Sequence, residues 1–136
     1  MRLNIAKHIY SVLSGTEAIA SRVRDERTGD LNIYPVATKV ERRFPLILFE
    51  RDTVTPRYDK DGCAVSEFDA TIFVVSETYT EGAEIAEMVI AALDRTPVEY
   101  DEFDVLDAVQ TGAVEGFQDR AFVQQIQFMF ITNPNK

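Results

Sequence analysis

A few side chains in the sequence have types and spacings that invite a chemical interpretation. His8 and Ser11 lie three residues apart on a predicted helix, which makes their side chains neighbours. A hydrolase built on such a pair also needs an acid that orients the histidine and donors that stabilise an oxyanion, and the sequence assembles neither. We therefore expect no enzyme and no catalytic residues, with His8 solvated or partly packed.

Cys63 is the only cysteine, so the chain can form neither an internal disulfide nor a multi-thiolate zinc site. A reactive thiol needs a basic and exposed setting, whereas Asp59 and Asp61 lie nearby and Lys60 alone opposes them. We predict an inert cysteine in a reducing, intracellular compartment.

Two acidic stretches suggest a cation site, and neither has the required spacing. Asp59-Lys60-Asp61-Gly62 resembles part of a calcium loop, but aligning Gly62 with the invariant glycine puts Arg57 and Phe68 where acidic ligands are needed. A later segment is crowded with carboxylates that fit no known cage: Glu99, Asp101, Glu102, Asp104 and Asp107. The glycines are scattered and form no phosphate-binding loop. We predict no metal site and no cofactor.

The chain is strongly acidic, and its charged residues are unevenly distributed along the sequence. The formal net charge is −9, which gives the chain no electrostatic reason to coat DNA. Arginines concentrate in the first half of the chain, and the acidic cluster lies in the second. Such segregation suits head-to-tail self-association. Ordinary solvated surface charge is the alternative, and the sequence leaves it open.

The 136 residues are enough for one domain with a hydrophobic core, and no run is long and apolar enough for a membrane span. Residues 3–13 are predicted to form an amphipathic helix whose buried face carries Ala6, Ile9, Tyr10 and Leu13. Thr16 is predicted to cap a second helical turn.

The middle of the chain is predicted to form two strands and a projecting hairpin. Residues 46–51 and 63–75 have strand patterns, and the second alternates apolar and polar side chains. The connection 52–62 is predicted to be a long loop at the hairpin tip. Its residues suit partner contact, with an idle solvent loop as the alternative: Pro56, Arg57, Tyr58 and Lys60.

The second half begins with the clearest local signal, a capping box formed by Thr78 and Glu81 before a helix that runs to about Asp94. Strands are predicted at 104–110 and 113–118, joined by a turn at Thr111-Gly112, and at 120–131, before a frayed end at 132–136. The expected fold class is α+β: a mainly antiparallel sheet with an N-terminal helix and a longer central helix on one face, and an extended hairpin projecting from the core.

These elements carry a family resemblance. Its motifs are Ile33-Tyr34-Pro35, Phe44-Pro45-Leu46-Ile47, Thr55-Pro56 with Tyr58, the strand from Phe68 to Val75, and Glu77-Thr78-Tyr79-Thr80-Glu81 before the helix. Over residues 3–131 the chain resembles the tail-completion, or tail-terminator, proteins of long-tailed bacteriophages and prophages. It departs from that pattern in the loop 37–43, where smaller residues and more proline are expected.

The resemblance implies a structural assembly protein that caps the tail tube as a ring, typically a hexamer, and joins it to the head connector. DNA would pass through the lumen without specific binding, and no membrane would be involved. The protein would act in the bacterial cytoplasm during assembly and then in the virion tail. Contacts are expected at the hairpin tip and at Arg42, Arg43, Glu99, Asp101 and Glu102. The alternative is a small ligand-binding or regulatory α+β module that acts as a dimer.

Overall fold

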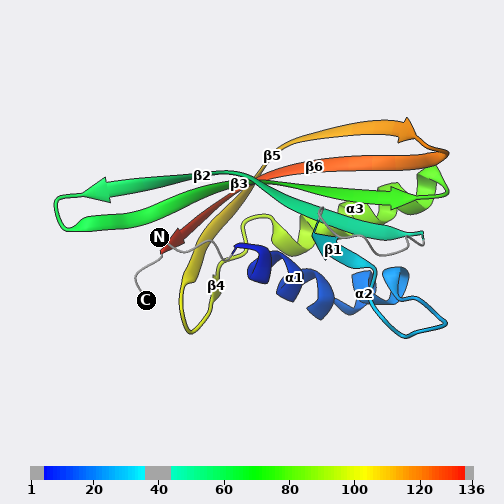
Figure 1. Ribbon diagram of the computed structural model, residues 1–136, viewed down its shortest axis with the longest axis horizontal. Helices are drawn as coiled ribbons and strands as arrows, with labels where there is room; N and C mark the ends of the chain where they lie inside the picture. Colours follow the sequence, from blue (N-terminus) through cyan, green and yellow to red (C-terminus); the bar gives the residue numbers. More distant parts are fainter. Residues whose placement is uncertain (1–4, 36–43, 134–136) are drawn as a thin grey trace.

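A computed structural model describes residues 5–35 and 44–133, which form three helices and one six-stranded sheet (Figure 1). The fold is therefore α+β, as predicted. In chain order the elements are α1 (Ile5–Gly15), α2 (Glu17–Val23), β1 (Ile33–Pro35), β2 (Leu46–Asp59), β3 (Gly62–Ser76), α3 (Tyr79–Leu93), β4 (Val98–Glu99), β5 (Asp104–Gln118) and β6 (Ala121–Asn133).

The strand order of the sheet is β1-β2-β3-β6-β5-β4. The hairpins β2–β3 and β5–β6 therefore meet where β3 pairs with β6, from Ser66 opposite Thr132 to Ser76 opposite Phe122. Every neighbouring pair is antiparallel except β1 with β2. The prediction of a mainly antiparallel sheet is confirmed.

Both hairpins are longer than the sequence suggested. β2 and β3 remain paired until Asp59 faces Gly62, so residues 52–59 belong to a strand, and the prediction of a long loop at 52–62 was wrong. Thr111-Gly112 is likewise no turn, because β5 is continuous and a register shift between Gln110 and Gly112 absorbs the extra residue as a bulge. We call residues 52–65 the arm. Figure 1 shows it extending past the helices.

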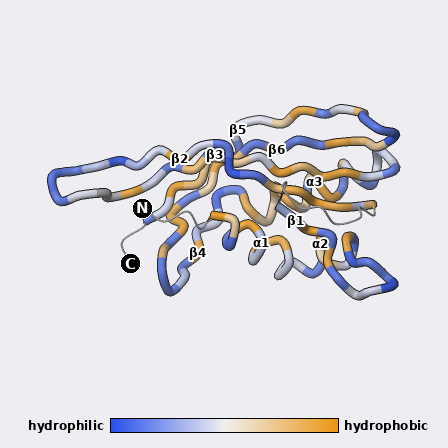
Figure 2. Tube along the Cα trace, in the orientation of Figure 1, coloured by the Kyte–Doolittle hydropathy of each residue, from blue (hydrophilic) through white to orange (hydrophobic). Residues whose placement is uncertain are grey.

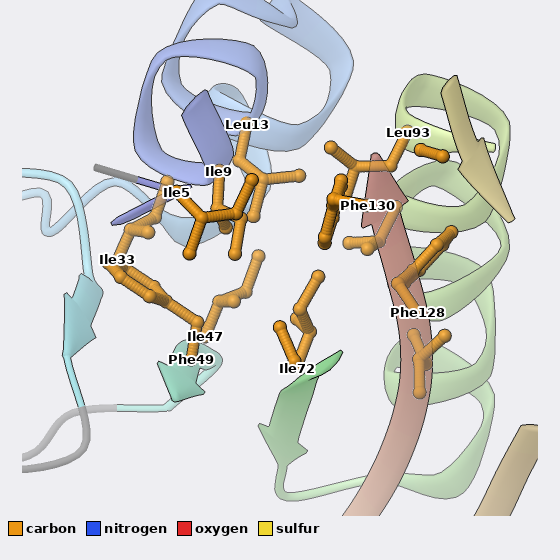
Figure 3. Close-up of a cluster of buried hydrophobic side chains, with 14 of the residues drawn as sticks. Ile5, Ile9, Leu13, Ile33, Ile47, Phe49, Ile72, Leu93, Phe128 and Phe130 are labelled. Atoms are coloured by element: carbon orange, nitrogen blue, oxygen red, sulfur yellow. The ribbon is translucent and has the colours of Figure 1, made fainter. Parts of the chain in front are cut away.

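The core lies between the helices and alternate residues of the central strands. Phe68, Ala70, Ile72 and Val74 of β3 are all buried, which confirms the face predicted from their alternation. Figure 3 shows α1 and α3 side chains converging on this face together with Phe128 and Phe130 of β6. Figure 2 shows hydrophilic residues at the arm tip, in the β4–β5 turn and in the turn between α2 and β1.

The two N-terminal helices differ in detail from the prediction. The buried residues of α1 are Ile5, His8, Ile9 and Leu13, whereas Tyr10 is 44% exposed and Ala6 is exposed. The stripe is rotated because α1 also packs on β1 and β2. Thr16 precedes α2 without capping it by its side chain, because its hydroxyl donates to the Val12 carbonyl at 2.7 Å.

The start of α3 follows the predicted capping box in part. The Thr78 hydroxyl oxygen accepts from the Glu81 N–H at 3.3 Å, as expected. The Glu81 carboxylate lies 3.9 Å from the Arg22 guanidinium of α2. One turn into the helix, a Cβ added at Gly82 would lie 2.5 Å from the Ser76 hydroxyl, which donates to the Thr78 carbonyl at 2.7 Å. Gly82 is therefore required by a close approach of helix and strand.

This approach gives a prediction whose sign depends on the background. Helix propensity alone favours alanine over glycine by about 1 kcal/mol. We expect Gly82→Ala to lower the free energy of unfolding by about 1 to 2 kcal/mol, because the methyl group displaces the Ser76 hydroxyl. In a Ser76→Ala background the same change should raise it. Urea unfolding of the four proteins measures both effects, and an equal sign in the two backgrounds would contradict the packing argument.

Candidate interaction surfaces

His8 is fully buried, so the expectation of a solvated or partly packed histidine was wrong. Its Nδ1 lies 2.8 Å from the Tyr100 hydroxyl, and its ring stands edge-on to Phe130 with centroids 5.5 Å apart. Its Nε2 is buried without a hydrogen-bond partner among the described residues. Burial lowers the pKa of His8 to about 4, so the ring is neutral at physiological pH.

Ser11 and His8 both bind Tyr100, so they do not form a catalytic pair. Burial raises the pKa of the Tyr100 hydroxyl, and its hydrogen bond with Ser11 opposes that shift. Tyr100 also stacks on the buried Phe103, with ring centroids 4.8 Å apart. The arrangement ties α1 to the β4–β5 turn, which is a structural role that single-sequence reasoning missed because 92 residues separate His8 from Tyr100.

The arm presents the first group of predicted contact residues. Arg57 lies in β2 and donates to Glu67 of β3 through Nε at 3.3 Å and a terminal nitrogen at 3.2 Å. This ion pair raises the pKa of Arg57 and holds the Arg57 guanidinium in one orientation on an exposed strand. Tyr58 is 70% exposed, Lys60 is exposed and Pro56 is half-buried. Cys63 is on the arm, but its side chain lies outside the described ones.

The β4–β5 turn presents the second group. Glu99, Asp101 and Glu102 are exposed, while the neighbouring rings of Tyr100 and Phe103 stack on each other and Phe103 is buried. Asp107, further along β5, accepts from Arg95 Nε at 3.0 Å. Among the described residues no three His, Cys, Asp or Glu side chains are grouped closely enough to hold a metal ion. The turn is therefore an acidic surface.

The predicted contact residues do not form one site. The arm and the β4–β5 turn belong to strands on opposite sides of the sheet order. Figure 1 shows both at the same end of the molecule, with the end of β6 between them. Arg42 and Arg43 lie outside the described residues.

An apolar surface at the other end of the sheet was missed. Phe117 and Tyr79 are 63% and 50% exposed, and both contact Phe122, with centroids 4.8 and 6.0 Å from its ring. Glu115 accepts from Gln124 at 3.0 Å, and its hydrogen bond with Tyr79 lowers the pKa of Glu115 and raises that of Tyr79. The sequence pattern predicted two short strands in place of β5. The surface was therefore missed, because Phe117 is exposed at the far end of one continuous strand.

Three comparisons place these features among known proteins. A family model described as tail completion protein gp17 matches residues 7–133. No curated protein sequence matches the chain. Among solved structures, 17 chains match. One, from a structure described as the virion of a native gene transfer agent particle, has a TM-score of 0.76 and 15% identity, with 92% of this chain and 91% of that chain covered. At this identity the likeness shows the fold.

A further property concerns the helices. No helix in the described ranges has both the length and the hydropathy to cross a membrane.

The burial of His8 predicts a pH dependence of stability. Its folded-state pKa of about 4 lies below the unfolded value of 6.5, so the unfolded chain binds the proton more readily. The stabilisation is fully present above pH 6.5 and is lost as the pH falls towards 4, by about 3 kcal/mol in total. Urea unfolding at pH 7.5 and 4.5 measures it. A His8→Leu variant should lose less stability over this interval, and an equal loss in both proteins would contradict the assignment.

Proposed function

We propose that this chain, which belongs to the tail completion protein gp17 family, is a structural protein that closes the end of a phage-type tail tube as a ring of identical subunits. The observation that carries the proposal is the family match over 7–133, nearly the whole described chain. The likeness of its fold to a chain of a gene transfer agent virion supports the same conclusion. The ring would be a hexamer that joins the tube to the head connector, assembled in the host cytoplasm and retained in the tail.

Head-to-tail contacts are the means by which such a ring would close. A heterologous interface uses two different surfaces of each subunit and generates a closed ring when the rotation between copies permits it. The sequence between Thr96 and Asp119 contains no lysine or arginine, whereas most of the arginines precede Tyr58. Opposite edges of one sheet therefore differ in charge, which supports repeated contact between unlike edges.

The arm and the acidic β4–β5 turn are the surfaces we assign to the tube protein or the connector. They lie at the same end of the molecule, so a ring would present both on one of its faces (Figure 1). The arm offers an exposed tyrosine and a fixed arginine, which are residue types favoured at the centres of interfaces. The net charge of −9 supports a lumen along which DNA slides without adhering.

A ligand-binding or regulatory dimer is the second candidate, and one hollow favours it. This hollow of about 520 Å³ lies beside α2 and is lined in part by Arg22, Arg24 and Arg27. Two of these cations already have partners within the chain: Arg22 contacts Glu84 at 3.5 Å, and Arg24 donates to the Gly29 carbonyl at 3.1 Å. Engaged cations are poorly placed to bind a ligand anion, so we favour the ring.

The ring proposal predicts two results for the purified protein. Light scattering over a concentration series, with negative-stain images, should show closed rings, either free or after the cognate tube protein is added. Added protein should also stop tube growth when it is present at a few rings per tube end. Unaltered tube length at saturating protein would contradict the proposal, and a dimer at every concentration would favour the second candidate.

If the arm contacts the tube or the connector, a substitution on the arm should weaken capping without changing the stability of the fold. Tyr58→Ala should change the free energy of unfolding by less than about 0.5 kcal/mol, because the side chain is 70% exposed. The amount of protein needed to stop tube growth should rise about tenfold, as expected for the loss of one interface aromatic residue. Glu87→Ala, at an exposed position on α3 outside the proposed contact surfaces, is the control and should cap normally. Equal capping by both variants would remove the arm from the interface.

A further inference from the structure

The β5 strand has an open edge over its second half. β4 covers β5 only at Asp104 and Val105. Further along β5, the two residues that follow α3 make hydrogen bonds to this edge. The Arg95 N–H donates to the Ala108 carbonyl at 2.6 Å, and the Asp94 carboxylate accepts from the Gln110 N–H at 2.9 Å. From residue 111 to 118, no other element of the described chain pairs with this edge.

The direction of the free backbone groups follows from strand alternation. Ala108 and Gln110 direct their backbone groups away from β6, since they bond to Arg95 and Asp94. The bulge between Gln110 and Gly112 shifts the phase by one residue. Antiparallel alternation then turns the N–H and C=O groups of Ala113, Glu115 and Phe117 outward. These groups form a ready template for another strand.

On the opposite side of the sheet, the described residues protect β2 and leave β1 as the outermost strand. Along β2, the bulge between Arg51 and Thr53 and the charges around it discourage pairing. The same alternation turns Pro56 outward, where it has no N–H to offer. β1 covers β2 from Ile47 to Phe49 and is itself the outermost strand. Its backbone alternates from Asn32, whose carbonyl accepts the Ile47 N–H at 2.8 Å, so Ile33 and Pro35 face outward.

The β5 edge and the outer edge of β1 lie in the same rows of the sheet. Val114 is opposite Gln125, which is opposite Phe73, then Leu48, then Tyr34. Glu115 shares the next row with Ile33, and Ala113 shares another with Pro35. Copies related by rotation about an axis along the strands would therefore bring residues 113–115 level with residues 33–35 of the neighbour. Because β2 runs parallel to β1 and opposite to β5, this pairing would be antiparallel.

We propose that the β5 edge from Ala113 to Glu115 binds β1 of a second copy of this chain by strand addition, so that the sheet continues from subunit to subunit. The inference rests on the proposed ring and assigns its lateral contact. Glu115 and Ile33 would exchange both backbone bonds, and the Ala113 N–H would donate to the Pro35 carbonyl. The net charges support a second copy as the partner: residues 96–119 carry seven carboxylates and no cation, whereas residues 22–35, which lead into β1, carry three arginines and three carboxylates.

The register gives a cross-linking test. In a Cys63→Ser background, Val114→Cys and Tyr34→Cys would occupy directly opposed, non-hydrogen-bonded positions, where Cβ atoms lie about 4.5 to 5.5 Å apart. Within one chain the two residues are separated by the whole sheet. Mild oxidation of assembled rings should give a ladder of covalent oligomers on a denaturing gel. Leu106→Cys with Tyr34→Cys is the control, because Leu106 is also exposed on β5 but lies about 22 Å along the strand from Val114. It should give no ladder.

A second pair of variants tests the strand pairing without cysteines, in case the double-cysteine protein does not fold. Glu115→Pro removes the central outward N–H, and Glu115→Ala removes the carboxylate but keeps that N–H. We expect the proline variant to need at least about tenfold more protein for half-assembly than the alanine variant, because each interface loses a backbone bond. The strand pairing would be overturned if rings of the cysteine protein gave no ladder, or if the two Glu115 variants assembled equally well. Either result would leave the proposed function standing. Absence of rings on the tube as well would overturn both.

Discussion

The antiparallel pairing of β3 with β6 is the constraint on which the rest of the structure depends. Among the described strands it is the only backbone pairing between the two long hairpins, since the sheet order places β2 on one side and β5 on the other. It also sets side by side the buried residues Phe68, Ile72, Phe128 and Phe130, against which α1 and α3 pack. A slip of one residue would turn these side chains to the other face, so the hydrophobic pattern fixes the register.

The same pairing explains why so much of the molecule is left uncovered. Each hairpin is longer than the stretch that the core needs, so β2 and β3 continue into the arm and β5 continues to an exposed aromatic surface at Phe117. Exposed strand edges are a liability in an isolated protein, because they pair with other chains. Under the proposed function, such edges would serve as contacts between subunits. Here Pro56 and the bulge after Arg51 protect one edge, while beyond Gln110 no other described strand pairs with the outer edge of β5.

The buried polar groups serve the fold, and the exposed ones carry the proposed contacts. His8 and Tyr100 bind each other inside the molecule and hold the β4–β5 turn against α1. That turn then points its carboxylates to solvent, near the end from which the arm extends (Figure 1). The chain belongs to the tail completion protein gp17 family, and the proposed function assigns these surfaces to contacts with its own copies and with the tail components around it.

The sequence by itself determined the fold class, the capping of α3 by Thr78, the buried face of β3 and the family, because each depends on local periodicity or on short motifs. It did not determine that residues 52–59 extend β2 or that β5 is continuous through Thr111, because Pro56 and Gly112 are turn signals in isolation and are tolerated only at a strand edge and at a bulge. Tertiary structure also decided the burial of His8, since its partner Tyr100 is distant in sequence. The alignment of β1 and β5 in common rows arises from four successive strand registers, and no single segment of the sequence contains that information.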